Sequence, residues 1–359
     1  GKSFLLFNLF HNHLIETGIS EDHIIEIALD DRLNKNLRDP DVILQHIHER
    51  IVDDKLYYII LDEVQMIDEF TDVLNSLLHI RNADVYVTGS NSKFLSKDVV
   101  TEFRGRGDEI HLFPLSFAEL YNSIGGDKFE LWKSYYTYGG LPGILELDSE
   151  KKKAAYLRSL HETVYLKDII ERNNLKNSEE FMELMRVMAS CIGSPCNPSK
   201  LENTFKSVKN ETLDRKTISK YLSYMEDAFL IEKSMRYDIK GRKYIGTLSK
   251  YYFQDIGLRN ALLNFRQVEE NHIMENVIYN ELRLRGFCVD VGMVEARTAK
   301  ERKQLEVDFV ANMADRRYYI QSAFAMPDDD KREQECASLK KIDDSFKKII
   351  IMRDDIKPY

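Results

Sequence analysis

In the N-terminal part of the chain, apolar positions recur with two different periods. Stretches with helical spacing alternate with short, mostly apolar runs that are typical of buried strands. Helices that alternate with such strands indicate an α/β fold built on a parallel sheet. Pro114 closes one more apolar run, so we expect a further strand at residues 109–113. The predicted helices are residues 4–17, 41–52 and 70–80, and the other predicted strands are residues 23–29, 56–62 and 84–88.

The pattern changes near residue 115, where mainly helical spacing begins. A turn with two glycines, Tyr138-Gly139-Gly140-Leu141-Pro142, follows the first two predicted helices of this part. Three later helices, the third capped by Asp214, precede two strands around a polar turn, which is the order of a winged helix. The predicted helices are residues 117–124, 129–138, 150–172, 180–190, 198–208 and 215–229, and the strands are residues 230–237 and 250–253.

From about residue 270 the spacing predicts a mixed α/β segment. Its order is one helix, three strands, a second helix and a final strand, which resembles the core of restriction endonucleases. The predicted helices are residues 272–285 and 329–342, and the predicted strands are residues 287–294, 304–311, 317–324 and 347–352.

Two short motifs in the N-terminal part carry candidate chemistry. Gly1-Lys2-Ser3 runs directly into a predicted helix, as a phosphate loop does, with the lysine on the β- and γ-phosphates and the hydroxyl on Mg²⁺. A later predicted strand ends in Asp62-Glu63, which offers one acid for the metal and a second acid to orient or activate water. A chance Gly-Lys-Ser and an acidic helix cap are the alternatives. A phosphate loop also needs a glycine, four further residues and a strand before Gly1, so we expect sequence upstream.

Two polar segments follow the next predicted strand. Asn91, in Thr88-Gly89-Ser90-Asn91-Ser92, is placed to sense a γ-phosphate, and an ordinary turn is the alternative. Arg106, with Arg104 as the second choice, is a candidate to neutralise the transferring phosphoryl group, in its own chain or in a neighbouring subunit. A surface arginine in a glycine turn is the alternative.

Composition excludes several classes of protein. The 359 residues carry a net charge of −9, so the whole protein is not a basic nucleic-acid coat. A local basic segment nevertheless lies between Phe205 and Lys250, with eleven Lys and Arg against six Asp and Glu. No apolar run is long enough for a membrane span, and the four cysteines form no Cys-x-x-Cys pair, so we expect a cytoplasmic protein without membrane contact.

The ordered motifs resemble those of prokaryotic AAA-type ATPases that carry a C-terminal domain of unknown function. Besides the motifs above, Phe113-Pro114-Leu115-Ser116-Phe117 and Glu306-Val307-Asp308 contribute to this resemblance, which covers essentially the whole chain. It implies ATP and Mg²⁺ as cofactors, with Gly1, Lys2 and Ser3 on the nucleotide, Ser3 and Asp62 on the metal, and Glu63, Asn91 and Arg106 in catalysis.

The resemblance and the spacing together predict an α/β fold class with four domains. A P-loop NTPase core with a parallel sheet, lacking its first strand and half of its phosphate loop, is expected at residues 1–115. A helical lid at 116–178, a winged helix at 179–265 and a restriction-endonuclease-like domain at 266–359 follow. We expect the last domain to be inactive.

Candidate nucleic-acid contacts lie on the predicted winged helix. Exposed Lys and Arg side chains there would bind phosphates in a salt-dependent way, and a solvated face used for protein contacts is the alternative. These residues are Arg215, Lys216 and Lys220 on the third helix and Lys240, Arg242 and Lys243 on the wing.

The C-terminal domain departs from an active nuclease. Glu275 and Asp308 fit two of the acidic positions that bind Mg²⁺ in that fold. Gln321 stands where another acid is expected, and Ala323 stands where a lysine is expected. A degenerate site and a scaffold for partners are therefore the favoured interpretation.

The sequence favours a Mg²⁺-dependent ATPase that acts as a molecular switch, with DNA as a candidate partner. A nucleotide-gated interaction module that does not hydrolyse ATP is the second hypothesis, and a nuclease is the third. An oligomer and a protein partner are also candidates, because an arginine supplied in trans requires a second subunit.

Overall fold

The structure is a computed structural model that describes residues 1–89, 106–209, 213–266, 269–297, 302–326 and 328–353. The chain forms two compact units, Gly1–Leu112 and Phe113–Tyr359. Each unit is described by itself.

The N-terminal unit is an α/β layer structure, which confirms the predicted parallel sheet. Its three parallel strands lie in the order β1 (Ile24–Ala28), β2 (Tyr57–Asp62) and β3 (Ala83–Val87). The helix that leaves Gly1 comprises α1 (Lys2–Phe4), a π-helical segment (Leu5–Phe10) and α2 (His11–Glu16), and the other α-helices are α3 (Pro40–Arg50) and α4 (Phe70–Leu77).

Strand β2 is apolar because helices cover both of its faces. Ile59 and Leu61 belong to the core shared with α3 and α4, whereas Ile60 packs with Leu14 of α2 on the opposite face. All three strand side chains are fully buried. A central parallel strand therefore loses the polar alternation that a one-sided sheet would show, and its acids appear only where it ends.

The expected strand at residues 109–113 is wrong. Residues 108–116 contain no helix or strand, and the side chains of Ile110 and Leu112 are 78% and 43% exposed. Apolar residues at alternate positions imitate a strand in the sequence, but here they lie in the connection between the two units.

The C-terminal unit begins with a helical part. The predicted long helix is interrupted at its centre, where α8 (Glu150–Leu160) continues as a π-helical segment (His161–Leu166) and then α9 (Lys167–Asn173). Asp214 caps α12 as predicted, because its carboxylate accepts from the backbone N–H of Lys216 and Thr217. The other helices are α6 (Phe117–Ile124), α7 (Lys128–Tyr138), α10 (Ser178–Ser190), α11 (Pro198–Thr204), α12 (Arg215–Asp227), α13 (Ile256–Leu262), α14 (Glu270–Leu284) and α15 (Asp329–Leu339).

The double-glycine turn is required by close packing. The backbone N–H of Gly140 donates to the buried carboxylate of Asp255, 2.8 Å away. A Cβ on Gly140 would lie 2.0 Å from the carbonyl oxygen of Leu115, and Gly139 has a φ of +79°. The motif therefore has a structural reason within the C-terminal unit.

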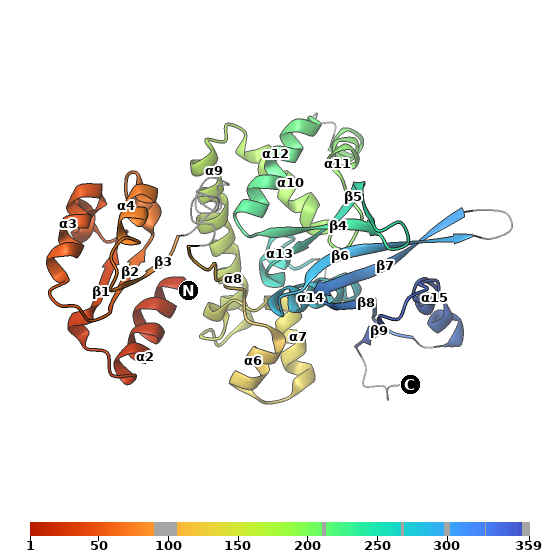
Figure 1. The fold of residues 1–359 in the computed structure, drawn as a ribbon. Helices are drawn as coiled ribbons and strands as arrows, with labels where there is room; N and C mark the ends of the chain where they lie inside the picture. The colour runs from red at the N-terminus through yellow and green to blue at the C-terminus, as the bar shows by residue number, and fades with distance from the viewer. Residues whose placement is uncertain (90–105, 210–212, 267–268, 298–301, 327, 354–359) are drawn as a thin grey trace. The chain divides into compact units, whose positions relative to one another are not determined.

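One six-stranded sheet spans the rest of this unit, in the order β5-β4-β6-β7-β8-β9 (Figure 1). Strand β4 pairs antiparallel with β5 and parallel with β6, so the hairpin that we interpret as a wing continues into the C-terminal sheet. The strands are β4 (Ile231–Asp238), β5 (Lys243–Phe253), β6 (Cys288–Arg297), β7 (Arg302–Met313), β8 (Arg316–Ala323) and β9 (Lys347–Met352).

Candidate functional site

Lys2 lies beside the ends of the parallel strands. Its ammonium donates to the carbonyl of Gly89, which follows β3, at 2.6 Å. Partial burial lowers the pKa of Lys2, and the nearby charges of Glu63 and then Asp62 oppose that shift. Within the described residues, no carboxylate forms a direct ion pair with Lys2. The structure therefore brings the predicted phosphate-binding lysine and the predicted acids into one neighbourhood.

Asp62 is held at the end of β2 by a residue of the neighbouring strand segment. Its carboxylate accepts a short hydrogen bond from the hydroxyl of Thr88, and both side chains are buried. The Thr88 hydroxyl in turn accepts from the backbone N–H of Glu63 at 3.2 Å. Thr88 thus fixes the orientation of Asp62 while the second carboxylate oxygen stays available.

Glu63 has an unusual backbone conformation. Its φ of 54° and ψ of 45° lie in the left-handed region, which costs a side-chain-bearing residue about 1–2 kcal/mol. Gln65 donates a short hydrogen bond from its amide to the Glu63 carboxylate. Such strained positions concentrate at functional sites, and here the strain turns Glu63 out of the line of the strand.

The remaining predicted residues of this site are less constrained. Gly1 and Ser3 are exposed at the start of α1. Arg106 is exposed, and its guanidinium donates to the amide oxygen of Asn75 on α4 at 3.4 Å. Asn91 and Arg104 lie outside the described residues.

A second group of carboxylates surrounds Lys250 on β5. The ammonium of Lys250 lies 2.8 Å from Glu275 Oε1 on α14, 2.7 Å from Glu306 Oε1 and 3.7 Å from Asp308 Oδ1, the last two on β7. Tyr252 also donates to Glu275 Oε1 at 2.7 Å. We call Lys250, Glu275, Glu306 and Asp308 the lysine–carboxylate centre.

Burial and neighbouring charges together shift the pKa values of Lys250 and Asp308. Burial by itself would lower the pKa of Lys250, but the charges of Glu275, Glu306 and Asp308 raise it above the ordinary value. Burial, followed by the charge of Glu275, raises the pKa of Asp308 to about 7. Three carboxylates against one ammonium thus favour a proton on the centre.

The predicted degenerate nuclease residues do come together. The amide oxygen of Gln321 accepts from the backbone N–H of Asp308 at 3.4 Å, and its amide donates to Glu335 at the same distance. The other Asp308 oxygen accepts from the backbone N–H of Ser322 at 2.8 Å. Gln321, on β8, therefore connects β7 to α15.

The site residues that the sequence reasoning does not single out are Glu306, Lys250, Tyr252 and Thr88. Glu306 and Asp308 are two residues apart on one strand, as are Lys250 and Tyr252, so each pair shares a face. We had counted Lys250 in the basic segment, but only 2% of it is exposed. It therefore adds nothing to a basic surface. Thr88 was passed over in favour of Asn91.

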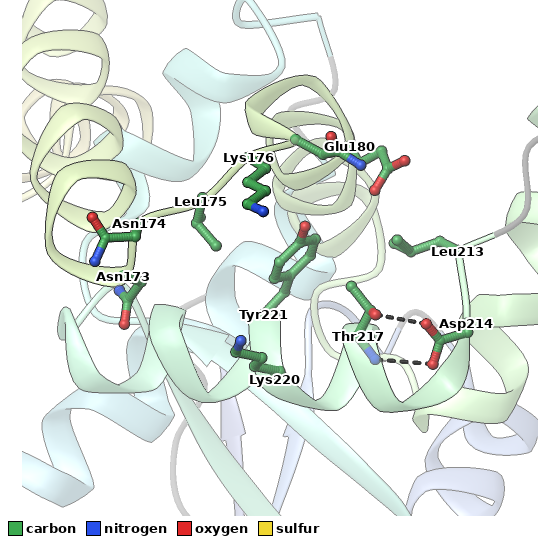
Figure 2. A pocket seen from close by; sticks show the side chains of 11 residues that line it. Asn173, Asn174, Leu175, Lys176, Glu180, Leu213, Asp214, Thr217, Lys220 and Tyr221 are labelled. Carbon is green, nitrogen blue, oxygen red and sulfur yellow. Dashed lines mark hydrogen bonds between the residues drawn. The ribbon is translucent and has the colours of Figure 1, made fainter.

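All six predicted nucleic-acid contacts are exposed on the C-terminal unit. Lys220 also lines a polar cavity of about 490 Å³ between the end of α9, α10 and the start of α12 (Figure 2). Figure 2 shows Tyr221 between Lys176 and Lys220, with Thr217 donating to Asp214 at 2.6 Å at the edge of the cavity. Asn173, Asn174 and Asn177 supply amides to the same lining. The residue composition of this cavity suits a polar ligand.

Two family models match parts of this chain. Residues 1–121 match the family described as an AAA domain, and residues 129–269 match a family described as a domain of unknown function, DUF8612. The N-terminal unit is thus an AAA-type, P-loop ATPase-like domain, and a domain of unknown function follows it.

Relatives extend over the whole chain. A Haemophilus influenzae protein named as uncharacterised is 33% identical over 98% of this chain and 86% of its own length. An uncharacterised protein of Methanocaldococcus jannaschii is 28% identical over 99% of this chain and 80% of its own length. The chain belongs to the same family as the Haemophilus influenzae protein. A Vibrio cholerae crystal structure aligns with 93% of this chain and 90% of its own, at 12% identity and a TM-score of 0.19, and bears no weight.

Within the described ranges, no helix is long and apolar enough to cross a bilayer.

Proposed function

We propose that the N-terminal unit binds ATP with Mg²⁺, hydrolyses it, and acts as a molecular switch for the C-terminal unit. The observation that carries this proposal is the neighbourhood of Lys2, Asp62 and Glu63 at the carboxyl ends of parallel strands. Ligands of open α/β sheets bind at that edge. The match to an AAA domain supports the same conclusion.

The residues present suit a nucleotide and a magnesium ion. Lys2 has no ion-pair partner among the described residues and is thus available for phosphate oxygens. Asp62 uses one carboxylate oxygen on Thr88 and keeps the other, and the exposed hydroxyl of Ser3 is a second oxygen donor. Mg²⁺ prefers oxygen ligands of this kind and, when bound, neutralises charge on the phosphates.

Glu63 is our candidate for the residue that orients the attacking water. Its left-handed backbone directs the side chain away from the strand, and Gln65 holds the carboxylate by a hydrogen bond. A carboxylate in this role accepts a proton from water or aligns it with the γ-phosphorus. Asn91 stays a candidate sensor, although it lies outside the described residues.

Arg106 is proposed as the residue that stabilises charge on the transferring phosphoryl group. Among the described residues, its exposed guanidinium makes one weak contact, to Asn75, and is therefore able to move toward a ligand. Whether it acts in its own chain or across an oligomer is decided by mixing inactive Arg106→Ala and Glu63→Gln chains. If the mixture recovers ATP hydrolysis, Arg106 of one chain acts at the nucleotide site of another chain.

ATP binding and ATP hydrolysis test the proposal separately. Lys2→Ala should weaken ATP binding by roughly tenfold or more, because a charge-assisted phosphate contact is lost. Glu63→Gln should keep ATP binding and lose hydrolysis. Unchanged ATP affinity in Lys2→Ala would refute the site. A Glu63→Gln variant that hydrolyses ATP like the wild type would instead support the non-hydrolysing interaction module.

Association with DNA is a second proposal, and a local pairing favours it. Cys196, between α10 and α11, forms an antiparallel bridge with Ser249 on β5. Side chains of α10, α11, α12, β4 and β5 share one core. We interpret the three helices and the hairpin, with this additional pairing, as a winged helix. The exposed side chains of Arg215, Lys216 and Lys220 on α12 would then contact phosphates.

Charge reversal on α12 tests DNA association. Lys216→Glu with Lys220→Glu should weaken duplex binding and reduce its dependence on salt concentration. Lys151→Glu with Lys152→Glu is the matched control, because these exposed lysines lie on α8. Equal loss in both double variants would show that only net charge matters. A duplex that neither binds nor stimulates hydrolysis would remove the proposal.

A further inference from the structure

The restriction-endonuclease-like order of the C-terminal strands implies a divalent cation among acidic side chains. The acids are present, since Glu275, Glu306 and Asp308 converge from α14 and β7. They converge on the ammonium of Lys250, which β5 supplies. The donor set therefore does not suit a metal ion, because two of the three carboxylates form direct ion pairs with this ammonium, at 2.8 and 2.7 Å.

We propose that Lys250 is a built-in replacement for the divalent cation, so that the lysine–carboxylate centre is a metal-excluding ion cluster. Lys250 is 2% exposed, and Glu275 and Asp308 are each 8% exposed. A buried ammonium at 2.7–2.8 Å from two carboxylates forms charge-assisted hydrogen bonds of normal length. It supplies the positive charge that Mg²⁺ would otherwise supply.

Oxygens of all three carboxylates already have partners within the protein. Glu275 Oε1 accepts from both Lys250 and Tyr252. One oxygen of Asp308 accepts from the backbone N–H of Ser322, and the other faces Lys250. A divalent cation within a few ångströms of the ammonium would also be repelled by it. Among the described residues, no group of three or more His, Cys, Asp and Glu side chains is arranged to hold a metal ion.

The centre also has a mechanical consequence. It connects β5, an edge strand of the sheet, to α14 and to the central strand β7. Asn276, next to Glu275 on α14, adds two buried hydrogen bonds of 2.7 Å to the backbone of Phe253 on β5. The former metal position has therefore become an anchor that holds the hairpin on the rest of the unit.

Manganese binding tests this inference, because Mn²⁺ is a paramagnetic substitute for Mg²⁺. Wild-type protein without nucleotide should bind no Mn²⁺ at this centre by electron paramagnetic resonance or calorimetry. Lys250→Ala should gain one site, at least about tenfold tighter than any site of the wild type, because three carboxylates lose their cation. Lys250→Arg keeps a cation and should gain none. Adding Asp308→Asn to Lys250→Ala should remove the gained site.

Two results would overturn the inference, and neither depends on a folded Lys250 variant. The first is stoichiometric Mn²⁺ binding by nucleotide-free wild type that disappears in Asp308→Asn. The second is Mg²⁺-dependent cleavage of DNA by wild type that disappears in the same variant. Either would make Lys250 a partner of a metal rather than its replacement. Wild type that neither binds Mn²⁺ without nucleotide nor cuts DNA supports the inference even if Lys250→Ala does not fold.

Discussion

Lys2 in the N-terminal unit and Lys250 in the C-terminal unit both lie near carboxylates, yet their surroundings differ. Lys2 is partly exposed, donates to a backbone carbonyl and has no ion pair among the described residues. Lys250 is buried and contacts three carboxylates. The pKa of Lys2 is lowered by burial, whereas that of Lys250 is raised by its acidic neighbours in spite of burial.

The difference shows that a lysine and nearby carboxylates can form either a candidate ligand site or an internal ion cluster. In the N-terminal unit, Lys2 forms no ion pair with the acids among the described residues, which is the arrangement that the proposed nucleotide and cation require. In the C-terminal unit, the ammonium of Lys250 and the surrounding carboxylates neutralise one another. Nearness in the fold is therefore a weaker sign of activity than the presence of unsatisfied charges.

The largest expected effect contrasts the two aspartates. Asp62→Asn should lower Mg²⁺-dependent ATP hydrolysis by about a hundredfold or more, because the metal loses a charged ligand next to the phosphates. Asp308→Asn should leave hydrolysis at the wild-type rate per folded molecule. Steady-state phosphate release measures both. Equal losses of ATP hydrolysis in the two variants would contradict different roles for Asp62 and Asp308.

Stability provides the next contrast. Lys250→Met should lower the free energy of unfolding by about 3–5 kcal/mol, because it leaves buried carboxylates without their counter-charge. Lys220→Met, on an exposed face of α12, should change it by less than about 0.5 kcal/mol. Urea unfolding followed by circular dichroism gives both values. An unchanged free energy of unfolding in Lys250→Met would mean that the ion pairs of the lysine–carboxylate centre do not stabilise the fold.

A smaller effect is expected at Gln65, which positions Glu63. Gln65→Ala should lower kcat by about tenfold without changing ATP affinity, because the Glu63 carboxylate loses the hydrogen bond that orients it. Gln65→Glu should be no better, since it replaces the donor with a like charge. A change in ATP affinity alone would assign Gln65 to binding instead of to orientation.

The smallest effect is a pH dependence of stability. The pKa of Asp308 in the folded protein is raised to about 7 by burial and by Glu275, so the folded state holds its proton more tightly than the unfolded state does. Its contribution is present below about pH 4 and is lost as pH rises toward 7. Asp308→Asn should flatten this part of the stability curve.

The charged groups around Asp308 set the control for that experiment. Lys250 on β5, Glu275 on α14 and Glu306 on β7 face Asp308. Glu306→Gln removes one like charge and should shift the decline to lower pH. A pH profile that is identical in wild type and Asp308→Asn would contradict a raised pKa at this residue.

Local patterns predicted most helices and strands, because apolar spacing and caps such as Asp214 act over a few residues. Residues 109–113 were misassigned because exposed Ile110 and Leu112 imitate a buried alternation. The pairing of β4 with β6 depends on contacts between residues far apart in the chain, which no local pattern records. The two clusters of acids could be anticipated from Asp62-Glu63 and from Glu275 with Asp308. The neutralising role of Lys250 could not, since burial was needed to distinguish it from the surface lysines nearby.

The central claim is that the acids near Lys2 form no ion pair with it among the described residues, whereas the acids of the lysine–carboxylate centre are neutralised by Lys250. The most direct measurement is the number of Mn²⁺ ions bound per chain, with and without a non-hydrolysable ATP analogue. We predict one Mn²⁺ that requires the analogue, is lost in Asp62→Asn and is unaffected by Asp308→Asn. A Mn²⁺ ion that binds without nucleotide and is lost in Asp308→Asn would contradict the account.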